Sequence, residues 1–158
     1  MPRDVYFTPR LKSQLTKTYG LHLTDEGFTQ CHQVCKSHDA DQLACAAVGL
    51  DLRKLSKGSF PNVISNPSPS DEGVVLDGPF YLQVVSCKNI AQPSISQHAN
   101  ANSRTRYLYL QVTDGATKAA AVEHHHVAKL SLDKLPPGTK LVLRHVPFQR
   151  GMLLLDPR

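Results

Sequence analysis

Three consecutive histidines, His124 to His126, have the clearest capacity for chemistry in this sequence. Imidazole is a common zinc ligand, and in an extended strand the first and third side chains of such a run share one face. His124 and His126 could therefore hold one metal ion, but Glu123 would lie on the opposite face with His125, and a third ligand must come from elsewhere. We interpret the run as solvent-exposed residues near the end of a strand and predict no metal site.

Two of the four cysteines have a spacing that a metal site could use. Cys31 and Cys35 are four residues apart and would share one face of a helix, but tetrahedral zinc needs two more ligands at suitable spacing. No C-x-x-C pair is present, and a reducing compartment keeps such cysteines as thiols. We expect small buried thiols.

Motifs for covalent or phosphate chemistry are absent from the sequence. It contains no G-x-S-x-G, no G-x-x-x-x-G-K and no G-x-G-x-x-G, and no pair of acids lies in an apolar setting. No cysteine has a nearby base that would activate it as a nucleophile. The sequence therefore predicts a protein that is not an enzyme and uses neither a cofactor nor a small-molecule substrate.

The composition is that of an ordinary globular protein. Of the 158 residues, 41% are hydrophobic and 20% are charged, which argues against a fibrous or wholly disordered chain. The net charge of +5 suits a polyanionic partner without requiring one. No apolar run approaches the roughly 18 residues of a membrane span, and the start MPRDVYF lacks the apolar core of a signal peptide. We expect an intracellular protein without a membrane partner.

The elements that must position these residues begin with three predicted helices. Thr8 and Thr24 are typical N-cap residues for the first two helices. The third runs through DADQLACAAVGLDLRKL, with Asp39 or Asp41 as its cap and a bend at Gly49. The N-terminal part therefore predicts a small helical bundle.

The second half has the alternating pattern of β-strands. The strands expected are FYLQVVSCK, RYLYLQVT, ATKAAAVEH, LVLRHV and GMLLLD, with a two-residue turn at Asp114-Gly115 and a final turn containing Gly151. A helical turn, KLSLDKLPPGTK, separates the third strand from the fourth. Five short strands with a helical turn at this position match the OB-fold, a partly open five-stranded barrel.

These patterns together predict an α+β chain. Residues 1–58 form an N-terminal helical domain, residues 59–78 a linker rich in Pro, Ser, Asn and Gly, and residues 79–158 the OB-fold. A long loop, Ile90 to Thr105, joins the first two strands of the barrel. Closing such a loop costs only about 1 kcal/mol more than closing a four-residue loop, so the fold can tolerate it.

Single-stranded nucleic acid is an alternative ligand for such a barrel. OB-folds bind single strands with aromatic platforms and cationic rims. Tyr107 and Tyr109, with Arg104 and Arg106 beside them, provide both kinds of group, and Arg144 and Arg150 are expected toward the last hairpin. The competing interpretation is that the two tyrosines cover the outer barrel face against the helical half.

Several segments together resemble a known family. These segments are HLTDEGFTQC, GLDLRKLSKGSFP, GPFYLQVVSCKNIA, LYLQVTDG, AAAVE, KLPPGTKLVL and GMLLLD, in that order. The sequence is similar to the N-terminal region of the Tudor domain-containing protein 3 family and, more distantly, to the RecQ-mediated genome instability protein 1 family. The resemblance extends from about residue 21 to residue 156. The run of histidines departs from it.

The resemblance implies a regulatory scaffold that binds a type IA topoisomerase, topoisomerase III beta, and reaches DNA or RNA mainly through that enzyme. It implies that the Ile90 to Thr105 loop reaches the gate of the topoisomerase. The methylarginine-reading Tudor module of such proteins is not in this sequence, and the end LLLDPR, just after the last strand, suggests a fragment. The partner-binding residues expected are Ile90, Pro93, Ile95, His98, Asn100 and Asn102 in the loop, with exposed Val122 and Met152 on neighbouring strands.

Overall fold

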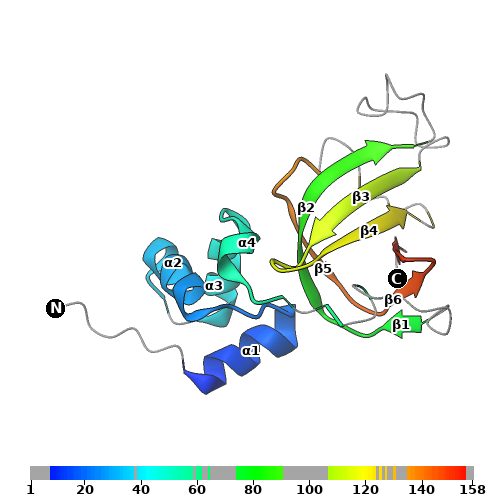
Figure 1. The fold of residues 1–158 in the computed structure, drawn as a ribbon. Coiled ribbons are helices and arrows are strands. Elements are labelled where there is room, and N and C mark those ends of the chain that lie inside the picture. The colour runs from blue at the N-terminus through cyan, green and yellow to red at the C-terminus, as the bar shows by residue number, and fades with distance from the viewer. Residues whose placement is uncertain are drawn as a thin grey trace.

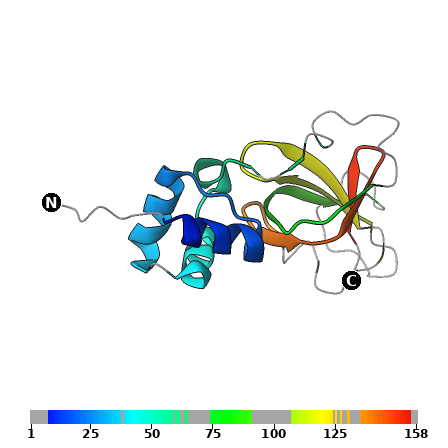
Figure 2. The same ribbon diagram turned by 90° about the horizontal axis from the view of Figure 1, so that it is seen from below.

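The computed structural model describes residues 8–37, 39–58, 60–61, 64, 74–90, 107–123, 125, 127, 130 and 135–155. In this part of the chain four helices precede a seven-stranded sheet, so the protein is α+β as predicted. The helices gather at one side and the curled sheet at the other (Figure 1), and the view from below shows the same arrangement (Figure 2). No helix within the described residues is long and apolar enough to cross a membrane.

The first three N-terminal helices begin where the sequence predicts. The helices are α1 (Pro9–Tyr19), α2 (Asp25–Cys35), α3 (Ala40–Val48) and α4 (Leu52–Leu55). Leu11 N donates to Thr8 Oγ1 at 3.2 Å, and Gly27 N donates to Thr24 Oγ1 at 3.0 Å, so both threonines are N-caps. The left-handed φ of 69° at Gly20 ends α1.

The predicted third helix is two helices. Asp39 precedes α3 but its side chain makes no capping hydrogen bond, and α3 ends at Gly49. Asp51 then caps α4, because its side chain accepts a hydrogen bond from Arg53 N. The expected bend at Gly49 is therefore a break in the helix.

One apolar core holds the four helices together, and Tyr81 of the sheet belongs to it. Its buried residues are Leu11, Leu15, Leu21, Leu23, Phe28, Cys31, Leu43, Ala44, Ala46, Ala47, Leu52, Leu55 and Tyr81. Gly27 lets α2 approach α4 closely, since an ideal Cβ at this position would lie 2.2 Å from Leu55 O.

The sheet has the strand order β1-β6-β7-β4-β3-β2-β5. The strands are β1 (Val74–Leu76), β2 (Phe80–Asn89), β3 (Leu108–Thr113), β4 (Lys118–Glu123), β5 (Lys140–Leu143), β6 (Val146–Gln149) and β7 (Met152–Leu155). All pairs are antiparallel except β4 with β7, which is parallel. The side chains on the inner face of the sheet form the second apolar core, which includes Leu82, Val84, Leu110, Val112 and Phe148.

The described residues form seven strands where five are predicted, because one long strand is broken and one short strand lies in the predicted linker. The expected strand LVLRHV is interrupted at His145, which has a φ of 51°, and so becomes β5 and β6. Val74–Leu76 forms β1 within the segment expected as a linker and pairs with β6. The domain boundaries themselves stay a prediction. The expected helical turn before β5 lies partly outside the described residues.

Turn geometry follows the sequence at one hairpin and departs from it at another. Arg150 and Gly151 have φ values of 53° and 76° between β6 and β7, which confirms the final turn. The β3–β4 turn has four residues, 114–117, instead of two. The Asp114 side chain causes this difference, because Asp114 Oδ1 accepts a hydrogen bond from Thr117 N at 2.7 Å.

Two side chains of β2 join the helices to the sheet. Tyr81 Oη donates to Ala44 O at 3.1 Å, and burial raises the pKa of this tyrosine above its ordinary value. Leu52 N donates to Gln83 Oε1 at 2.7 Å, while Gln83 Nε2 donates to Asp51 Oδ1 at 3.2 Å. The side-chain amide of Gln83 therefore accepts a hydrogen bond from the backbone of α4 and donates one to Asp51, the residue that caps this helix.

Further contacts extend this junction on both sides of β2. Phe60 N donates to Asp114 Oδ2 at 2.8 Å. Lys140 Nζ donates to Val48 O at the end of α3, at 3.3 Å. Because polar and apolar contacts cross the junction at several strands, the helices and the sheet pack as one unit.

We expect acid to weaken this junction through Asp51. Arg53 donates hydrogen bonds to both carboxylate oxygens and thereby lowers the pKa of Asp51 to about 2. The folded pKa is below the unfolded value, so the stabilisation is present above the unfolded pKa and is lost as pH falls through the folded pKa. The free energy of unfolding, measured with urea between about pH 5 and pH 2, should therefore fall more steeply with decreasing pH for the native chain than for Asp51→Asn.

The matched control for this pH dependence is Asp39→Asn, since Asp39 makes no side-chain capping bond. Its urea midpoint should follow that of the native chain throughout the titration. Equal pH slopes for the native chain and Asp51→Asn would contradict the prediction.

Candidate protein-docking face

The outer face of the sheet carries side chains in three parallel rows. Core residues such as Leu110, Ala121 and Leu153 face inward, so their neighbours along each strand face outward. Strand pairing places Lys88, Tyr109, Val122 and Leu154 in the first row, Ser86, Gln111, Ala120 and Met152 in the second, and Lys140, Gln83, Thr113 and Lys118 in the third. The third row lies beside the helices, and the first row lies farthest from them.

The first two rows contain an apolar area, here named the outer strip, made of Tyr109, Ala120, Val122, Met152 and Leu154. Val122 is 2% exposed and the other four residues are half-buried. Lys88 Nζ lies 5.6 Å from the centroid of the Tyr109 ring, a cation–π distance. An apolar strip with a cation and polar groups at its edge is typical of a protein-docking surface.

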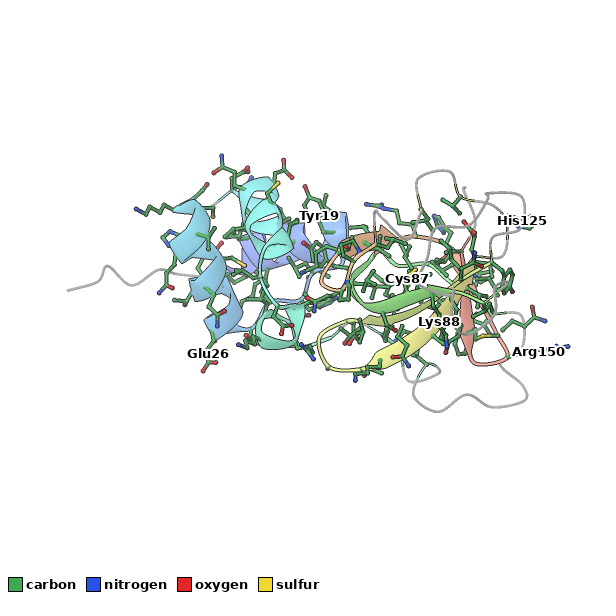
Figure 3. All side chains as sticks on the ribbon, turned by 90° about the horizontal axis from the view of Figure 1, so that it is seen from above. Tyr19, Glu26, Cys87, Lys88, His125 and Arg150 are labelled. Atoms are coloured by element: carbon green, nitrogen blue, oxygen red, sulfur yellow. The ribbon has the colours of Figure 1, made fainter. Side chains whose placement is uncertain are left out.

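The base of the long loop is held beside the first row. Tyr107 N donates to Asn89 Oδ1 at 2.9 Å, and Ile90 N donates to Tyr107 O at 2.9 Å. Asn89 is fully buried, so its side chain holds Tyr107 against the barrel, and the backbone bond from Ile90 joins the two ends of the loop. The loop therefore leaves the sheet next to the outer strip. Cys87 and Lys88, labelled in Figure 3, mark this end of β2.

The structure corrects one of the predicted partner-binding residues. Val122 is expected to be exposed, but it is buried, and the strand register places it between Tyr109 and Leu154. Met152 is half-buried on the same face, and Ile90 is 38% exposed at the loop base. The remaining predicted partner residues lie outside the described residues, namely Pro93, Ile95, His98, Asn100 and Asn102.

The nucleic-acid alternative stays a prediction, because the structure describes only part of its residues. Tyr107 is exposed at the loop base, but Tyr109 is half-buried with Lys88 over its ring. Arg104 and Arg106 lie outside the described residues. Arg144 Nη2 donates to Thr18 O at the end of α1, which commits that side chain to the junction.

The competing interpretation of the tyrosines is wrong for Tyr109. It lies in the row farthest from the helices, and Tyr81 is the tyrosine that packs against them.

The candidate metal ligands fall in two separate parts of the chain. His125 is exposed, while His124 and His126 lie outside the described residues. Cys31 is buried in the helical core, which raises the pKa of its thiol to about 11, and Cys35 packs against that core. Within the described residues, no group of three or more possible metal ligands is present.

Comparison with known proteins identifies the family to which this fold belongs. A family model described as RMI1, N-terminal OB-fold domain, matches residues 60–158. The chain belongs to the RMI1 N-terminal OB-fold family. This match shows an OB-fold domain in the second half of the chain, as the strand pattern predicts.

Named relatives of this OB-fold family come from animals and plants. The Tudor domain-containing protein 3 of Danio rerio is 35% identical over 149 residues, which cover 92% of this chain and 19% of the relative. That of Xenopus tropicalis is 36% identical, covering 70% of this chain and 15% of the relative. The RecQ-mediated genome instability protein 1 of Oryza sativa subsp. japonica is 31% identical, covering 68% and 13%. The chain therefore spans about a fifth or less of the length of these relatives.

Sequence reasoning missed part of the site in this OB-fold. Ala120 and Leu154 complete the outer strip, and Asn89 fixes the loop base. The alternation along β4 and β7 contains the signal for Ala120 and Leu154, since both have the same parity as the predicted Val122 and Met152. Nothing in the local sequence marks Asn89, whose partner is 18 residues away.

Proposed function

We propose that this chain is a non-catalytic scaffold that binds a type IA topoisomerase, topoisomerase III beta, and modulates its gate during strand passage on DNA or RNA. The observation that carries the proposal is the outer strip beside the fixed loop base. A scaffold needs a surface whose apolar side chains are removed from water when a partner binds. The outer strip provides such side chains on a sheet. The names of the relatives in genome-instability and Tudor-domain families support the same role.

In this proposal the outer strip anchors the enzyme and the Ile90 to Thr105 loop biases the gate. The hydrogen bonds from Tyr107 N to Asn89 Oδ1 and from Ile90 N to Tyr107 O fix where the loop leaves the barrel, so the docked enzyme meets the loop at one defined position. A ligand shifts an equilibrium between open and closed gates only if its affinity for the two states differs. The loop must therefore contact one gate state better than the other. We place the chain in the nucleus and cytoplasm, where such an enzyme meets DNA and RNA.

Replacing Met152 with aspartate is expected to weaken topoisomerase binding by about 2 kcal/mol, or roughly 30-fold in Kd. Met152 is half-buried in the outer strip, so a carboxylate at this position would lose its hydration on docking without gaining a partner. Co-elution in size-exclusion chromatography and titration calorimetry with purified topoisomerase III beta measure the loss. Val122→Asp is not a suitable variant, because Val122 is buried and the change would disturb folding.

The matched control is Val142→Asp on β5, since Val142 is an apolar strand residue that is 42% exposed and lies outside the outer strip. It should bind the enzyme as the native chain does. A Met152→Asp chain that binds normally would contradict the assignment of the strip. A native chain that ignores the enzyme and holds single-stranded oligonucleotide tightly would favour the alternative function, a single-strand binder using Tyr107 and Tyr109.

A further inference from the structure

Three lysines, here named the seam lysines, lie where α4 meets the turn between β3 and β4. They are Lys54, Lys57 and Lys118. An ideal Cβ at Gly115 would lie 2.9 Å from Leu52 O, so the turn rests directly against α4. Figures 1 and 2 both show α4 and this turn side by side. Lys54 belongs to α4, Lys57 follows it, and Lys118 is the first residue after the turn.

The seam lysines are exposed and their charges are not neutralised by bonded acids. Among the described residues none of the three forms an ion pair. On the same elements Asp51 pairs with Arg53, whereas the Asp114 carboxylate accepts hydrogen bonds from backbone N–H groups, so one carboxylate remains against the three lysines.

Acids on α2 do not offset the seam lysines either. Asp25 pairs with Lys12 at 3.6 Å. Glu26 extends from the start of α2 away from the sheet (Figure 3). The seam therefore presents an excess of positive charge on a firmly packed junction, which agrees with the net charge of +5.

We propose that the seam lysines bind the phosphodiester backbone of nucleic acid without reading its sequence. Ammonium groups on a rigid surface contact phosphate oxygens and displace condensed counterions, which requires no base-specific group. The inference goes beyond the scaffold function and does not depend on it. Lys54 and Lys57 lie on the helical side of the junction, and Lys118 lies in the third row, outside the outer strip, which occupies the first two rows. A chain docked through the strip would keep these lysines available for the substrate of its enzyme.

Charge reversal in the full 158-residue chain tests the proposal. Fluorescence anisotropy with a labelled single-stranded oligonucleotide, and with a duplex of equal length, measures Kd over a range of sodium chloride concentrations. The triple variant Lys54→Glu, Lys57→Glu, Lys118→Glu should bind at least about tenfold more weakly at low salt. Its log–log salt slope for the single strand should be smaller by about 2, the value for three lost phosphate contacts.

A control with the same net charge is Arg10→Glu, Lys17→Glu, Lys36→Glu, which changes two exposed cations on α1 and the exposed C-cap residue of α2. It should keep the affinity and salt slope of the native chain. Equal losses in both triple variants would overturn the proposal, as would a native chain that does not bind at low salt. Binding to phosphatidylserine vesicles without binding to either oligonucleotide would also overturn it. Because the seam triple variant should still co-elute with the topoisomerase, failure here is distinguishable from failure of the docking face.

Discussion

Replacing Gly27 with alanine is expected to destabilise the protein by about 3 kcal/mol. An added methyl group in a helix ordinarily stabilises it by about 1 kcal/mol, since alanine has the higher helix propensity. At this position the Cβ would lie 2.2 Å from Leu55 O and 2.8 Å from Leu55 Cα, so α2 and α4 would have to separate. That movement would also stretch the 2.8 Å hydrogen bond from Thr24 N to Leu55 O. Overpacking against backbone atoms therefore outweighs propensity.

Thermal unfolding followed by circular dichroism measures this effect. A loss of about 3 kcal/mol corresponds to a fall in Tm of roughly 6–12 °C for a domain of this size. Gly49→Ala is the matched control, because its Cβ would meet no atom within 4 Å and its φ of −88° suits any residue. A Gly27→Ala chain with the Tm of the native protein would show that α2 and α4 are not in close contact.

Replacing Gln83 with leucine is expected to lower the free energy of unfolding by about 2 kcal/mol. Leucine has a similar volume but cannot accept the hydrogen bond from Leu52 N. Leu52 is fully buried, so water cannot replace the lost acceptor. A buried donor without an acceptor retains the full cost of its dehydration. The same change removes the bond to Asp51 and so loosens the cap of α4.

Urea unfolding measures the global effect of Gln83→Leu, and amide hydrogen exchange at Leu52 measures the local one. The free energy of local opening at the Leu52 amide should fall further than the global free energy of unfolding, because the group that accepts its hydrogen bond in the described part of the chain is removed. Gln111→Leu is the control, since Gln111 is exposed on the same sheet face. Unchanged protection at Leu52 would mean that the bond from Gln83 does not hold the junction together.

Local signals in the sequence predict much of this fold. Thr8 and Thr24 cap their helices and Gly20 ends α1, because capping depends on residues within one helical turn. Strict alternation likewise predicts the inward and outward faces of β3.

Features that depend on distant partners are less accessible to sequence reasoning. Val74–Leu76 resembles a linker until β6 pairs with it, and the burial of Val122 follows from its neighbours across two other strands. Gln83 is an unremarkable polar residue in β2, and only the strand register places it under α4. Register and domain packing are set by contacts far apart in the chain, so local patterns do not specify them.

The order of synthesis gives the parallel pairing of β4 with β7 a consequence for folding in the cell. β7 is the last described strand, yet it occupies the space between β6 and β4 within the sheet. While the ribosome is still adding residues before Met152, the edges of β4 and β6 have no neighbour on that side. All helices of the described part have already been made by then, and so has Tyr81 of their core. A nascent chain can thus complete its helical half while β4 and β6 still have unpaired edges. We expect incorrect strand pairing to be most frequent at this stage of synthesis.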